Sequence, residues 1–199
     1  ASLATDGDHQ LDVTGHSLDG HLAMAFGSLF SGVTKGVTTF NAPGFKSTAT
    51  NQAFFSALGG ASAHVPTGTV TTNVIADEAA QGLPPWSAIA GRNSRPGVAI
   101  DIAIENQAAA DISGAPIALN HSQPVLTDAL SVATLISDIA PALSVAQINT
   151  LLKSAGSNAR TLENTLDALR TLLVDSSIAT DPARQTPTGD RDALYANLY

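Results

Sequence analysis

Residues 11–26, LDVTGHSLDGHLAMAF, decide the fold of this 199-residue chain. Leu11–Thr14 has the pattern of a short buried β-strand, and Leu18–Phe30 is rich in the Ala, Leu and Phe of a packed helix. A Gly-His-Ser turn separates the two. A strand, a tight glycine-containing turn and a helix in this order predict that Ser17 is held exposed at the turn.

Strands and helices continue to alternate downstream. Three further runs are rich in β-branched residues and predict strands, at Val37–Phe40, Thr69–Ala76 and Val98–Ile104. Asn51–Leu58 predicts a helix that Gly59-Gly60 ends. Strands separated by helical segments favour an α/β fold, with a parallel sheet and crossover helices.

The C-terminal part reads as purely helical. We expect the sheet-bearing domain, residues 1–143, to close with a helix that Pro124 opens and that reaches about Ile139. Residues 144–175 predict a helical hairpin appendage that begins at a capping box, Ser144–Gln147. Residues 176–199 read as a loosely ordered tail. The expected apolar stripes of the hairpin are Val145, Ile148, Leu151 and Leu152, then Leu162, Leu166, Leu169 and Leu173.

Composition excludes several classes of protein. Apolar residues make up 44% of the chain, which is enough for a core. A net charge of −8 argues against nucleic acid as a partner. No run of about 18 apolar residues appears, so we expect no transmembrane segment. The absence of cysteine excludes disulfides, thiol catalysis and cysteine-based zinc sites.

The chemistry expected at the turn is nucleophilic. A serine hydroxyl reacts poorly unless it is held beside a base, and a strand-to-helix turn presents it in that way. The N–H of Leu18 lies at the start of the predicted helix, where it can stabilise an oxyanion. A surface Gly-His-Ser turn without chemistry is the alternative.

Two segments resemble a known family. VTGHSLDGHLAMAF resembles the VTGHSLGG segment of α/β-hydrolase lipases of the class 3 type, and VTTFNAPGF, residues 37–45, resembles the strand and turn that follow it. The likeness is greatest to lipase-like domains of large exported bacterial proteins. It covers roughly residues 8–140, is most specific at 13–45, and implies the C-terminal half of an α/β-hydrolase.

The order of catalytic residues on this fold is serine, acid, histidine. His121 is the histidine that lies far enough downstream to act as the base, although it could also be an ordinary surface loop residue. Asp77 directly follows a predicted strand and would orient the imidazole. Glu78 and then Asp101 remain lower-ranked alternatives for the acid.

The resemblance implies a serine carboxylic-ester hydrolase that acts on lipid or acyl esters and needs no metal or cofactor. It also implies a bacterial protein of lipid metabolism that is secreted or displayed at the cell surface. A non-catalytic lipase-like module, structural within a large exported protein, is the alternative.

Two departures from the family pattern bear on these expectations. Asp19 stands where the family has glycine; crowding there typically costs about 1–3 kcal/mol, and its charge would oppose an oxyanion. Only ten residues precede the first predicted strand, where the family has several strands and a helix. The first strand would otherwise be an unpaired edge. We therefore expect the rest of a larger polypeptide upstream as a partner; a reduced form that pairs this edge with something else is the alternative.

Overall fold

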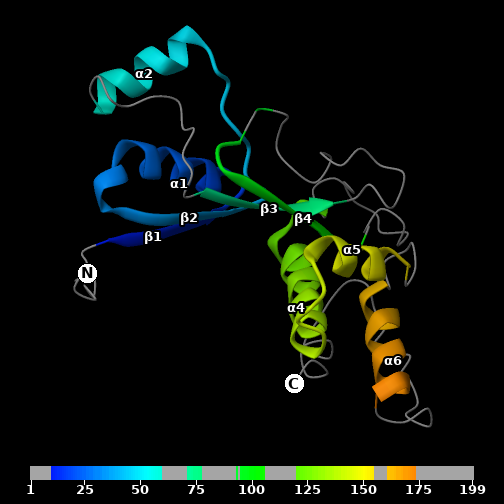
Figure 1. The fold of residues 1–199 in the computed structure, drawn as a ribbon. Coiled ribbons are helices and arrows are strands. Elements are labelled where there is room, and N and C mark those ends of the chain that lie inside the picture. Colours follow the sequence, from blue (N-terminus) through cyan, green and yellow to red (C-terminus); the bar gives the residue numbers. More distant parts are fainter. Residues whose placement is uncertain are drawn as a thin grey trace. The chain divides into compact units, whose positions relative to one another are not determined.

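The computed structural model describes residues 10–59, 71–77, 93, 95–105, 120–154 and 161–173. The chain divides into two compact units. The first comprises residues 1–75 and 89–101, and the second comprises residues 76–88 and 102–199. Figure 1 labels the elements of both units.

Four strands form one sheet, and their order in the sheet is their order in the chain. The pairs β1–β2 and β2–β3 are parallel, and β4 lies next to β3. The expected α/β class with a parallel sheet is confirmed. The strands are β1 (Leu11–His16), β2 (Thr34–Phe40), β3 (Thr71–Asp77) and β4 (Val98–Ala103).

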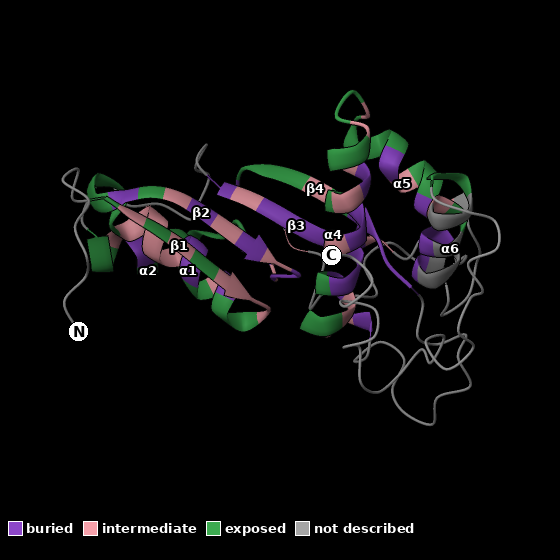
Figure 2. Cartoon of the chain, turned by 90° about the horizontal axis from the view of Figure 1, so that it is seen from below, coloured by how far each residue is buried: buried purple, intermediate pink, exposed green. Residues whose placement is uncertain are grey.

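Burial varies across this sheet (Figure 2). β3 is buried along most of its length, as its content of β-branched residues predicts. β1, at one edge, alternates between exposed and half-buried residues, with Asp12 and Thr14 exposed. The first residues of β4 are also exposed.

In the first unit, α1 (Leu18–Leu29) packs on β1 and β2, and the short 3-10 helix η1 (Ser31–Val33) leads into β2. Small residues make the close packing possible: a Cβ at Gly27 would lie 2.6 Å from Val37 Cγ2. α2 (Ala49–Gly59) contributes Phe55 to the same core. The buried cluster comprises Ala23, Met24, Val37, Ala42, Phe45 and Phe55.

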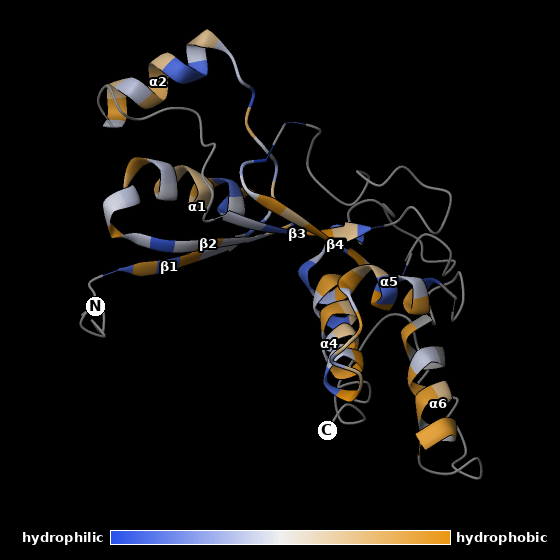
Figure 3. Cartoon of the chain, in the orientation of Figure 1, coloured by the Kyte–Doolittle hydropathy of each residue, from blue (hydrophilic) through white to orange (hydrophobic). Residues whose placement is uncertain are grey.

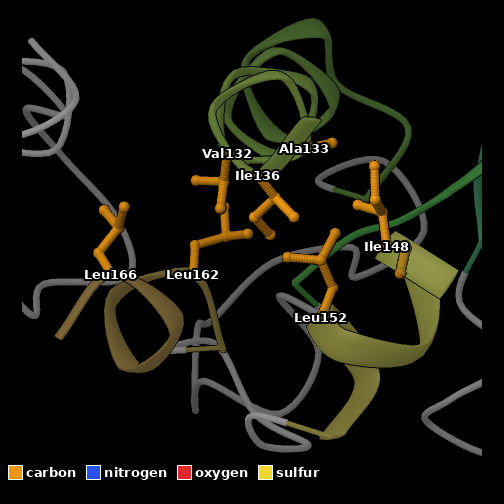
Figure 4. Close-up of a cluster of buried hydrophobic side chains, with 8 residues drawn as sticks. Val132, Ala133, Ile136, Ile148, Leu152, Leu162 and Leu166 are labelled. Carbon is orange, nitrogen blue, oxygen red and sulfur yellow. The ribbon is translucent and has the colours of Figure 1, made fainter. Parts of the chain in front are cut away.

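In the second unit three helices share a core (Figure 4). They are α4 (Gln123–Ile139), α5 (Val145–Ser154) and α6 (Thr161–Leu173). Much of the ribbon of α4 and α6 has the colour of hydrophobic residues in Figure 3. The buried cluster comprises Ala103, Val132, Ala133, Ile136, Ile148, Leu152, Leu162 and Leu166.

Local signals at the helix ends are confirmed. Pro124 lies in the first turn of α4, where a missing N–H costs nothing. The capping box before α5 is present: the Ser144 N–H donates to Gln147 Oε1 at 2.9 Å, and the Gln147 N–H donates to Ser144 Oγ at 3.3 Å.

The packing units differ from the sequence-based division at residue 143. α5 and α6, expected as an appendage, pack on α4, which precedes that residue. The expected tail, residues 176–199, lies outside the described residues. None of the helices in the described ranges is long and apolar enough to cross a membrane.

Candidate functional site

Ser17 occupies a strained backbone conformation between β1 and α1. Its φ is 53° and its ψ is −123°, whereas a positive φ is uncommon for residues other than glycine. Such a conformation costs on the order of 1–3 kcal/mol and persists only when the surroundings hold it. The strand-turn-helix arrangement expected around Ser17 is therefore present, with Ser17 as the one residue between the two elements.

Backbone hydrogen bonds hold this turn. The Ser17 N–H donates to Phe40 O at 2.9 Å, at the end of β2, and the His21 N–H donates to Ser17 O at 3.2 Å. The Asn41 N–H, on the same peptide group as Phe40 O, donates to Val74 O at 2.9 Å. One peptide group thus links the serine turn to β3. Asn41 also has a positive φ, 48°, and is fully buried.

Two glycines allow the tight approach of α1 to the strands. A Cβ at Gly15 would lie 2.4 Å from the carbonyl carbon of Asp19. A Cβ at Gly20 would lie 2.6 Å from Ala42 Cβ and 2.8 Å from Gly15 O. These three distances are shorter than Cβ atoms normally keep, so a side chain at Gly15 or Gly20 would force the neighbouring backbone to shift.

The expectation of crowding at Asp19 is wrong. The Asp19 side chain is exposed, and the close contact falls on Gly20, one residue later. The carboxylate of Asp19 remains in the first turn of α1, close in sequence to Ser17.

Leu18 is the first residue of α1, and its side chain is exposed. The first four N–H groups of a helix lack intrahelical acceptors, and the helix dipole makes them attractive to negative charge. The predicted oxyanion donor, the Leu18 N–H, belongs to this set.

A buried polar chain links β2 to β3 and to the segment before β4. Thr39 Oγ1 donates to Asn73 Oδ1 at 2.8 Å, and Asn73 Nδ2 donates to Pro96 O at 2.6 Å. The Thr39 and Asn73 side chains are both buried. Arg95 Nε donates to Ala42 O at 2.6 Å; burial lowers the pKa of Arg95, and Asp101 opposes that effect.

The sequence around Thr39 and Asn73 does not indicate this chain, because the two residues are 34 positions apart in separate predicted strands. The pairing became visible only with the register, in which Thr39 stands directly opposite Asn73.

Asp77 is the last residue of β3, at the strand end where sequence reasoning placed it. Its Oδ2 accepts a hydrogen bond from Lys153 Nζ at 2.7 Å, and the exposed fraction of the Asp77 side chain is 13%. Asp77 O also accepts from the Ile104 N–H at 3.4 Å. The carboxylate therefore has a lysine partner that the sequence did not indicate.

His121 lies in the turn before α4, half-buried between the buried Asn120 and the half-buried Ser122. It belongs, like Asp77, to the second unit, whereas Ser17 and Leu18 belong to the first. The structure brings Ser17 and Leu18 together at one turn. It places Asp77 at the end of β3 and His121 in the turn before α4.

The remaining acids and histidines considered for the site occupy other positions in the chain than Ser17, Asp77 and His121. Glu78 lies outside the described residues, and Asp101 is exposed within β4. Glu105, which sequence reasoning missed, is buried just after β4, and its Oε1 accepts from the Leu162 N–H in α6 at 2.8 Å. His21 stacks on Phe45 at 4.0 Å, with its Nδ1 3.1 Å from Pro43 O.

Within the described ranges, no group of three or more His, Asp or Glu residues is placed to hold a metal ion. Comparison with protein-family models, with curated proteins and with solved structures found no match to this chain.

Proposed function

We propose that this chain is a serine hydrolase of the α/β-hydrolase, lipase-like type that cleaves carboxylic esters of lipids or other acyl groups. The observation that carries the proposal is the backbone of Ser17. A non-glycine residue at φ 53° is held between a parallel strand and a helix N-terminus, which is how a nucleophile elbow displays its serine.

The roles follow from this turn and from the chain order. Ser17 Oγ attacks the ester carbonyl while His121 takes its proton, and Asp77 orients the imidazole and stabilises its charged form. The Leu18 N–H donates to the oxyanion of the tetrahedral intermediate. Collapse of that intermediate expels the alcohol, which takes the proton from His121. Water then releases the acyl group from Ser17 by the same steps.

The test uses a fluorophosphonate probe, which reacts covalently with activated serines. The chain should be labelled at Ser17, as identified by mass spectrometry of the labelled peptide, and Ser17→Ala should abolish both labelling and ester turnover. Ser31→Ala, at an exposed serine in η1, is the matched control and should keep both. Labelling that survives Ser17→Ala would contradict the assignment.

A second candidate is a non-catalytic, lipase-like structural module. Asp19 favours it, because a carboxylate in the first turn of α1 would repel an oxyanion formed at Leu18 N–H. This candidate predicts a folded chain, with the circular dichroism of an α/β protein, that the probe leaves unlabelled.

A further inference from the structure

α5 presents two stripes of side chains, each spaced by four residues. Ile148 and Leu152 are buried in the core shared with α4 and α6. Asn149 and Lys153, each one residue further along, make polar contacts with the ends of β4 and β3. Residues four apart lie on one helix face, so the apolar and polar stripes run side by side.

The polar stripe binds the ends of two strands. Asn149 Oδ1 accepts from the Ala103 N–H at the end of β4, at 2.9 Å. One turn later, Lys153 Nζ donates to Asp77 Oδ2 at the end of β3, at 2.7 Å. α5 is thereby fixed to both strand ends by polar contacts, while its apolar stripe fixes it to the helices.

The ion pair is partly buried: the exposed fraction of the side chain is 34% for Lys153 and 13% for Asp77. Lys153 Nζ therefore holds the Oδ2 atom of Asp77 by a charge-assisted hydrogen bond.

We propose that Lys153 is a positioning residue for the reaction, acting through Asp77; this inference rests on the proposed function and on Asp77 as its acid. A triad acid must present one oxygen to the imidazole in a fixed direction. A charge-assisted hydrogen bond from Lys153 to Oδ2 restricts rotation of the carboxylate about its Cβ–Cγ bond. The sequence hid this role because Lys153 lies 76 residues after Asp77, in a helix with no chemical motif.

The test compares ester turnover of the full chain with that of Lys153→Met, which keeps the length of the side chain without the charge. We expect kcat to fall roughly 10-fold with KM within about twofold, a smaller loss than the roughly 100-fold that a 1 Å misplacement can cause. Lys153→Arg, which keeps a donor and the charge, should recover most of kcat.

Two further variants separate positioning from stability. Asn149→Leu removes the neighbouring contact of the same helix face, so it should lower Tm while leaving kcat within about twofold. If Lys153 acts through Asp77, the double variant of Lys153→Met and Asp77→Asn should be no slower than Asp77→Asn alone.

The outcomes distinguish the two proposals. Turnover that does not depend on Ser17, or no turnover at all, refutes the proposed function and this inference with it. Turnover that requires Ser17 and Asp77 but is unchanged or faster in Lys153→Met refutes the positioning role alone. Additive losses in the double variant also refute it, because Lys153 would then act independently of Asp77.

Discussion

Substituting Gly20 by alanine tests how closely α1 is held against the strands. The added Cβ would meet Ala42 Cβ at 2.6 Å, Gly15 O at 2.8 Å and Thr39 Cβ at 3.2 Å. None of these atoms is the end of a flexible side chain, so α1 itself must shift. Overpacking a core typically costs about 1–3 kcal/mol of stability. Because two contacts would be shorter than 3.0 Å, we expect Gly20→Ala to lie at the upper end of this range, about 3 kcal/mol. Alanine recovers about 0.5–1 kcal/mol of backbone entropy, which leaves a net loss of about 2 kcal/mol.

The measurement is urea unfolding followed by far-ultraviolet circular dichroism. With a slope of about 2 kcal/mol per molar urea, a loss of this size lowers the midpoint by about 1 M. Faster amide hydrogen exchange in α1 should localise the effect to the first unit. Gly32→Ala is the control, because nothing lies within 4 Å of its added Cβ, and it should change stability by less than about 0.5 kcal/mol. Equal midpoints for Gly20→Ala and the unmodified chain would refute the close packing of α1 on β2.

Two further predictions concern the neighbours of this turn. Because the Asp19 side chain is exposed, Asp19→Asn and Asp19→Gly should both raise kcat for a short-chain ester, by roughly 3- to 10-fold, well below the effect of an oxyanion donor. A gain for glycine alone would show that volume at this position matters after all. Thr39→Val removes the donor to Asn73 Oδ1 at a buried site and should destabilise the chain by about 1–3 kcal/mol in the same urea titration, whereas Thr39→Ser should lose less. A midpoint unchanged by Thr39→Val would mean that this hydrogen bond adds nothing to stability.

The parallel sheet and the order of its elements could be predicted because short runs rich in β-branched residues alternate with helical segments along the chain. The turn at Ser17 was equally readable, since its glycines and the helix that follows are local in sequence. Element ends were less accurate: the first strand extends to His16 rather than ending at Thr14. The hydrogen bond from the Ser17 N–H to Phe40 O extends the β1–β2 pairing to the turn itself, and only the fold reveals it.

The apolar stripe expected on α5 was half right. Ile148 and Leu152 are buried, but Val145 and Leu151 are exposed, and the polar Asn149 contacts the end of β4 instead. Periodicity identifies apolar side chains, yet it cannot show that polar ones face the protein as well. Contacts such as that of Lys153 join distant segments, and no local pattern encodes them.

The order of strands in the sheet has a consequence for synthesis on the ribosome. Because each strand pairs with its predecessor in the chain, the sheet can grow by adding strands in the order in which they leave the exit tunnel. At about 5–20 residues per second, residues 11–40 emerge over about 2–6 s. Until Phe40 emerges, the Ser17 N–H lacks its acceptor, and the strained turn has no support from β2. During that interval the apolar face of α1 is open to chaperones and to neighbouring nascent chains.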